Sequence, residues 1–158
     1  MSTNGIIARS TGEGTFSGRY HHCDSYPSGL GTSLVELYRG HFKRDLTRML
    51  QVLLDEHTGW STIVHKDFKL KPGYTNIGSR PDSMTIDQFM AQPLNRRPQC
   101  YCHDQRREEG WVADETSDCG AEWAYVFETI PAHDDGPEQK ILHVLYPEKN
   151  QTGEYAWR

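Results

Sequence analysis

The stretch TFSGRYHHCDSYPSGLGTSLVELYRGHF (residues 15–42) decides the fold, because its hydrophobic period changes part-way along it. Residues 16–23 are typical of a β-strand, and a Pro and two Gly then predict a turn. Beyond the turn, apolar residues recur at the three- and four-residue spacing of a helix: Leu34, Leu37, Tyr38 and Phe42. Thr32 or Ser33 is expected to cap this helix. The stretch therefore predicts a strand, a turn and a helix in direct succession.

The regions on either side add a second strand and a second helix. GIIARS (residues 5–10) joins residues 16–23 through the glycine-rich TGEG, which predicts a β-hairpin. Gly40 is expected to interrupt or end the first helix, and a second helix is predicted to begin near Asp45. This second helix carries a continuous apolar stripe, which indicates core packing: Leu46, Met49, Leu50, Leu53 and Leu54.

The C-terminal part of the chain is rich in strand-forming residues. EWAYVFET (residues 122–129) and KILHVLY (residues 140–146) alternate in character, and EYAWR (residues 154–158) predicts a further strand. The polar PAHDDGPEQ (residues 131–139) predicts a hairpin loop. We therefore expect one α+β domain over residues 1–158. Its mostly antiparallel sheet is formed by the N-terminal hairpin and the C-terminal meander, and two or three helices cover one face.

The middle of the chain is rich in Pro, Gly and charged residues. WSTIV (residues 60–64) predicts a short strand, and a short helix is expected around residues 86–90. Residues 66–83 and 91–122 predict long loops. Loops of this length in a compact domain usually bind something or need a clamp. The loops of residues 66–122 are therefore a candidate partner-binding region.

Composition and charge exclude several classes of protein. The chain has 158 residues, a net charge of -5 and no basic stripe, which argues against direct nucleic-acid binding because phosphates require Lys and Arg. No apolar run approaches the roughly 20 residues of a membrane span. The start MSTNGIIARS lacks the features of a signal peptide. We therefore expect a cytoplasmic protein without a membrane partner, whose cysteines are reduced or bind a metal.

The junction between the predicted strand and helix is a candidate ligand-binding site. A strand, a glycine-rich turn and a helix N-terminus expose main-chain N–H groups and the positive end of the helix dipole, which suit a phosphate or a carboxylate. The same run supplies hydroxyl groups, a histidine and an aromatic ring on which a base can stack. The candidate residues are Tyr20, His22, Asp24, Tyr26, Gly29, Gly31, Thr32 and Ser33. The alternative is an ordinary structural connection between a strand and a helix.

The run GRYHHCDSYPSGLGTSLVELY (residues 18–38) resembles a family of small proteins of bacteriophages and actinobacteria. The family signature is an aromatic residue, any residue, His, Trp, Asp, Gly, Tyr, Pro, any residue, Gly, any residue and Gly. Cys23 and Ser25 stand where the family has Trp and Gly, and these residues match: Tyr20, His22, Asp24, Tyr26, Pro27, Gly29 and Gly31. The later GAEWAYVF (residues 120–127) is similar to a recurring strand of the same proteins. The resemblance implies a small accessory protein of phage type, and such proteins often interfere with host defence.

Four potential metal ligands lie in or near the longest predicted loop: Cys100, Cys102, His103 and Cys119. Three cysteines and a histidine are an acceptable set for a structural zinc ion. A metal would also order a loop that has few apolar anchors. The spacing differs from the usual pair of cysteines two residues apart, so reduced thiols and a redox pair are the alternatives.

Three functions remain open on this basis. The leading one is a non-catalytic phage-type protein that binds an anionic, nucleotide-like ligand and thereby counters host defence. The second is a protein-binding inhibitor of a host defence complex that acts through residues 66–122. The third is a small hydrolase or phosphodiesterase in which His22 and Asp24 share one face of the strand and act as acid and base. The oligomeric state is open in all three.

Overall fold

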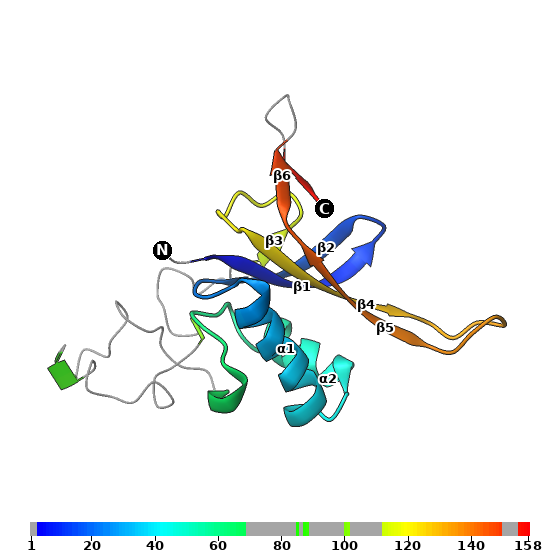
Figure 1. The fold of residues 1–158 in the computed structure, drawn as a ribbon, viewed down its shortest axis with the longest axis horizontal. Helices are drawn as coiled ribbons and strands as arrows, with labels where there is room; N and C mark the ends of the chain where they lie inside the picture. Colours follow the sequence, from blue (N-terminus) through cyan, green and yellow to red (C-terminus); the bar gives the residue numbers. More distant parts are fainter. Residues whose placement is uncertain (1–2, 69–84, 86, 89–99, 102–111, 150–154) are drawn as a thin grey trace.

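The computed structural model describes residues 3–68, 85, 87–88, 100–101, 112–149 and 155–158 (Figure 1). Within these residues a five-stranded sheet has the strand order β3-β2-β1-β4-β5. The strands are β1 (Gly5–Gly12), β2 (Thr15–His21), β3 (Val112–Asp114), β4 (Trp123–Ile130) and β5 (Gln139–Leu145). β1 and β4 pair in parallel, and the other neighbouring strands pair antiparallel. The predicted α+β class with a mostly antiparallel sheet is therefore confirmed.

The last strand differs from the prediction in its partner. β7 (Tyr155–Trp157) pairs with β6 (Pro147–Lys149) in a separate two-stranded sheet and does not extend the meander. Trp157 still contacts the main body of the fold. Its indole N–H donates a hydrogen bond to the carbonyl of Glu115 at 3.1 Å, and its ring meets Phe16 edge to face.

The first helical stretch begins earlier than the sequence predicts. Three segments follow one another without a break: a π-helical segment (Pro27–Gly31), α1 (Thr32–Glu36) and a second π-helical segment (Leu37–His41). The predicted cap at Thr32 or Ser33 is therefore wrong, and Tyr26 is the residue that precedes the helix. Pro27 suits the first helical position because it has no N–H to leave unpaired and its fixed φ is helical.

The second helix begins where the sequence predicts. Asp45 caps α2 (Leu46–Leu50), and its carboxylate accepts a hydrogen bond from the N–H of Arg48 at 2.9 Å. A π-helical segment (Gln51–Asp55) continues this helix. The first helical stretch ends at His41, next to Gly40, as the sequence predicts.

The predictions for the middle of the chain are met only in part. In place of a strand over residues 60–64, Trp60 forms isolated bridges to His21 and to Cys100. A short 3-10 helix (His65–Asp67) follows. Residues 87–88 are helical, and the remainder of the helix expected at 86–90 lies outside the described residues, as does most of 66–122.

The sheet separates two hydrophobic clusters. On one face Ile7, Tyr125 and Phe127 pack with apolar residues of both helical stretches, and α1 and α2 lie together on that side of the sheet (Figure 1). The other face carries a smaller cluster: Ile6, Ala8, Phe16, Ala113, Ala124 and Val126. This division follows from the strand geometry, because neighbouring residues such as Ile6 and Ile7 point to opposite faces.

Candidate functional site

His21 lies at the end of β2 and is enclosed by the fold. Its Nε2 accepts a hydrogen bond from the N–H of Ile63 at 3.0 Å, so the ring proton resides on Nδ1, which lies 2.7 Å from the hydroxyl of Ser25. Burial, together with the nearby His22, lowers the pKa of His21 from 6.5 to about 3. His21 is therefore a neutral structural histidine and cannot exchange protons readily with solvent.

Ser25 connects His21 to the centre of the sheet. Its hydroxyl bonds to the His21 ring, and its N–H donates to the carbonyl of Thr3 at 3.0 Å. Its carbonyl accepts a hydrogen bond from the Tyr125 hydroxyl at 2.7 Å, and burial raises the pKa of Tyr125. We call His21, Ser25, Ile63 and Tyr125 the buried corner. These bonds tie the end of β2 to β4 and to the segment around residue 63.

The strand geometry on which the predicted pairing of His22 with Asp24 rested does not extend to Asp24. β2 ends at His21, two residues before the predicted end, and Asp24 has a left-handed φ of 58°. The strand alternation that was expected to place His22 and Asp24 on one face therefore does not reach Asp24. Tyr20 is buried and its hydroxyl lies 2.8 Å from Nδ1 of His22, which is half-buried, whereas Asp24 is exposed.

The amides at the start of the helical stretch are engaged within the chain. The N–H of Gly29 donates to the carbonyl of Tyr26, and the N–H of Leu30 donates to the carbonyl of Asp24, both at 2.9 Å. Pro27 has no N–H. A Cβ on Gly29 would overlap the carbonyl oxygen of Asp24, so this glycine permits a close approach of main chain. These two amide donors of the predicted anion site are therefore used by the chain itself.

The remaining predicted ligand-binding residues lie on the helical stretch. A Cβ on Gly31 would come within 3.0 Å of the Tyr125 ring, so this glycine also serves close packing. Ser33 is buried, and its hydroxyl lies 3.5 Å from Nδ1 of His65. Thr32 is exposed and donates to a carbonyl one turn earlier. Ligand binding by these residues stays a prediction.

The structure does not bring the predicted zinc ligands together in the described part of the chain. Cys100 is buried with Trp60 in the cluster on the helical side of the sheet. Cys119 packs against the cluster on the opposite face, and its partial burial raises the pKa of its thiol. Cys102 and His103 lie outside the described residues. Among the described residues, no three His, Cys, Asp or Glu side chains are grouped to hold a metal, so zinc at this set stays a prediction.

A groove that sequence reasoning did not predict lies between the first helical stretch and β5. Its wider part, about 300 Å³, lies beside Val144 and is lined from the helix by Pro27, Gly31 and Thr32. Its narrower part, about 70 Å³, lies beside Lys140. Val35 and Leu142 line both parts, so the two parts adjoin along β5. We call it the β5 groove.

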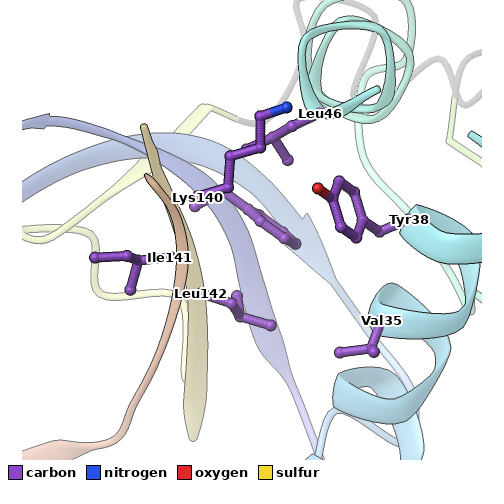
Figure 2. A pocket seen from close by; sticks show the side chains of 7 residues that line it. Val35, Tyr38, Leu46, Lys140, Ile141 and Leu142 are labelled. Atoms are coloured by element: carbon purple, nitrogen blue, oxygen red, sulfur yellow. The ribbon is translucent and has the colours of Figure 1, made fainter. Parts of the chain in front are cut away.

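Figure 2 shows how side chains from distant parts of the sequence form the narrow part of the groove. Val35 and Tyr38 of the helical stretch point toward the strand, Leu142 points back toward Val35, and Ile141 points away. Leu46 of α2 and Phe127 of β4 complete the lining. The walls are mostly apolar, with the ammonium of Lys140 at one end.

β5 is the strand at one edge of the sheet. Within the described residues, no strand pairs with its outer side. Leu142 lies opposite Phe127 in the register, so Lys140, Leu142 and Val144 share the face that bears the helices. Val144 is 42% exposed. In the described part of the chain, β5 therefore presents an edge that no strand covers, beside a mostly apolar groove.

The alternation in KILHVLY was the available sequence signal for this surface, although it gave no reason to place the strand at an edge. Comparisons with protein-family models, with curated proteins and with solved structures found no match to this chain. The resemblance of residues 18–38 to phage and actinobacterial proteins therefore stays an expectation. In the part of the chain that the structure describes, no helix is long and apolar enough to cross a membrane.

Proposed function

We propose that this protein acts by binding a polypeptide partner along the β5 groove and not by catalysis. The observation that carries this proposal is the outer edge of β5, with which no described strand pairs, beside an apolar groove. An edge strand offers a row of N–H and C=O groups that another extended chain satisfies well. Adding a strand at such an edge, with pockets for alternate side chains, is a recurring mode of peptide recognition.

The character of β5 supports this function. Proteins usually protect an exposed edge with a short strand, with charged side chains or with proline. β5 has seven residues, QKILHVL, of which Lys140 is the one charged residue besides the titratable His143. His143 lies on the opposite face, where its Nε2 is 2.6 Å from the carboxylate of Glu128. Apart from Lys140, the face beside the groove is apolar, and Val144 on that face is exposed.

The polar residues of the run at 20–25 support binding over catalysis. His21 is enclosed and neutral, and its two ring nitrogens bond to Ile63 and Ser25. A catalytic acid–base pair requires a side chain within hydrogen-bond reach of a reacting group and a suitable pKa. His21 has neither the exposure nor a free ring nitrogen.

The family resemblance suggests where the partner belongs. A phage-type accessory protein that binds a polypeptide acts by occupying a surface of a host defence complex. This is the protein-binding function that the sequence left open, moved from the loops of residues 66–122 to the β5 groove. It predicts that the partner segment is exposed in the free host protein.

A selection of random displayed peptides against the immobilised protein tests the proposed function. We expect enriched peptides that bind the wild-type protein and bind Val144→Lys at least about tenfold more weakly. Val112→Lys is the matched control, because Val112 is 56% exposed on β3 at the opposite edge of the sheet. Both variants should keep the wild-type melting temperature. A selection that enriches no peptide with this dependence on Val144 would contradict the proposal.

A further inference from the structure

Resting on the proposed function, we infer that the partner contributes an extended segment that adds antiparallel to β5. The segment carries a large apolar or aromatic residue, a small aliphatic residue and an acidic residue at alternate positions, in that order from its N-terminus. The inference follows from the spacing along β5, from the shape of the β5 groove and from the position of one lysine.

The spacing follows from the strand. On the face beside the helices, β5 presents Val144, Leu142 and Lys140 at two-residue intervals, about 7 Å apart. A strand added to this edge places its own alternate side chains next to these three residues and turns the intervening ones to the other face. The groove is therefore expected to contact the side chains at three alternate positions of the partner.

The shape of the groove indicates the size of the partner side chain at the first two positions. The wider part, about 300 Å³, lies at the Val144 end, and Thr32 and Glu36 line it with polar groups. It suits a large side chain such as tyrosine, whose ring fills the space and whose hydroxyl reaches these polar groups. The narrower part, about 70 Å³, is lined by both Leu142 and Lys140, and next to Leu142 it suits a small aliphatic side chain such as valine.

Lys140 decides the charge at the third position. It lines the narrow end of the groove, and its ammonium lies 3.7 Å from the carboxylate of Glu138 in an exposed and therefore weak ion pair. A carboxylate on the partner strand can approach this ammonium from the open side. Antiparallel pairing, which β5 already uses with β4 and which is the more stable arrangement, gives the order large, small, acidic.

The same charge argument favours a foreign segment over a second copy of this chain. On the groove face β5 carries Lys140, Leu142 and Val144. A second β5 paired over this strand would bring another lysine to that face, and the carboxylate of its Glu138 would already be paired with its own Lys140. The partner is therefore a segment of another protein whose acidic residue complements Lys140.

The probe is the synthetic peptide Ac-Thr-Tyr-Thr-Val-Thr-Glu-Thr-NH2, fluorescently labelled and titrated with the full-length protein. We expect saturable binding, at least about tenfold weaker for Val144→Lys and unchanged for Val112→Lys. A peptide of the same composition with Tyr and Val adjacent should also bind at least about tenfold more weakly. Equal binding of the two peptides would overturn the alternate-position requirement.

Charge reversal tests the role of Lys140. The variant Lys140→Glu should weaken binding of the probe several-fold, and replacing the glutamate of the peptide by lysine should restore binding to that variant. Lys140 is exposed, so the variant should keep the wild-type melting temperature. Failure of the reversed peptide to recover affinity would overturn the proposed contact.

Backbone N-methylation tests the strand pairing itself. In an added strand, alternate residues direct their N–H groups toward β5, so methylating one alternate set should abolish binding and methylating the other set should leave it unchanged. Amide hydrogen exchange should slow in Gln139–Leu145 when the unmodified peptide is present. Equal effects of the two sets would show that the peptide does not bind as an added strand.

The outcomes separate the inference from the proposed function. If displayed peptides depend on Val144 but lack the large, small, acidic pattern, the proposed function stands and the inference fails. If no displayed peptide depends on Val144, the proposed function fails as well. A dimer detected by light scattering and lost in Val144→Lys would overturn the inference in favour of a second copy as the occupant.

Discussion

The buried corner and the β5 groove differ in how their side chains are used. In the corner, His21 and Tyr125 direct polar atoms inward, and hydrogen bonds to Ser25 and Ile63 occupy those atoms. In the groove, Val35 and Leu142 present apolar surface that the chain leaves accessible. The most chemically distinctive part of the sequence is thus used to hold the fold together, and the more open surface is made of ordinary apolar residues.

The two edges of the sheet show the same contrast. β3 has three residues, and the carboxylate of Asp114 bonds to Thr116 and Ser117, which lowers the pKa of that carboxyl. β5 has seven residues and few charges. A short edge that ends in a charged turn is protected against pairing, whereas a long apolar edge is open to it. Substitutions in the corner should therefore change stability, and substitutions along β5 should change binding.

The largest expected effect is that of His21→Ala. This variant leaves a cavity and removes the hydrogen-bond partners of Ile63 and Ser25, so we expect a loss of about 3 kcal/mol in the free energy of unfolding. The melting temperature should fall by about 6–12 °C. His22→Ala is the matched control, because the neighbouring His22 is only half-buried and should cost about 1 kcal/mol or less. Equal losses of stability in the two variants would show that the buried His21 contributes no more to stability than the half-buried His22.

The second prediction concerns pH. The folded protein keeps His21 neutral down to a pKa of about 3, whereas the unfolded chain binds a proton below about 6.5. The unfolded state therefore binds more protons, and this stabilising contribution, complete above pH 6.5, decreases by about 1.4 kcal/mol per pH unit as the pH falls toward 3.

Urea unfolding at pH 7, 6 and 5 measures this dependence against His21→Gln. The amide oxygen of glutamine can accept the hydrogen bond of Ile63 and does not titrate, whereas the carboxyl groups of the protein contribute equally in both chains. The wild type should lose about 1.4 kcal/mol more than the variant between pH 6 and pH 5. If stability depended on pH equally in the wild type and in His21→Gln, the fold would not lower the pKa of His21.

Local patterns predicted the elements whose residues are close in sequence. The two extended runs at residues 5–10 and 16–23, joined by the glycine-rich TGEG, predicted the hairpin, and the stripe from Leu46 to Leu54 predicted the second helix. The helix start at Pro27 was missed because two glycines there suggest a turn, although both serve close packing. The strand pattern led to His22 as the candidate residue and did not reveal that His21 is buried, because that burial depends on contacts with Ile63 and Ser25.

The β5 groove could not be predicted from local sequence patterns, because it also depends on contacts between distant residues. Val35 and Leu142 meet only because β1 and β4 pair in parallel across more than 100 residues of sequence and place β5 at the edge. Parallel pairing of this kind leaves no signature in either strand by itself. The candidate ligand residues from Tyr20 to Ser33 were chosen for their chemistry, and the structure gives several of them a packing or hydrogen-bonding role.

A smaller effect is expected for Tyr125→Phe. The variant removes the hydroxyl that donates to the carbonyl of Ser25 and leaves that buried acceptor without its partner, at a cost of about 1–2 kcal/mol. Tyr146→Phe is the control, because Tyr146 is 48% exposed and should change stability by less than about 0.5 kcal/mol. Chemical denaturation measures both, and peptide binding should stay at the wild-type level in each. Weaker binding by Tyr125→Phe would mean that the corner also shapes the groove.

The smallest effects come from two helical glycines that differ in their surroundings. A Cβ on Gly31 would meet the Tyr125 ring at 3.0 Å, so Gly31→Ala should lose about 1 kcal/mol despite the better helix propensity of alanine. Among the described residues, no atom beyond its chain neighbours and its own helix backbone lies within 4 Å of a Cβ on Gly40, so Gly40→Ala should gain about 0.5–1 kcal/mol. Thermal melts measure both signs. Equal stabilisation of Gly31→Ala and Gly40→Ala would show that the Tyr125 ring can move away from an added methyl group. The buried corner would then not be tightly packed.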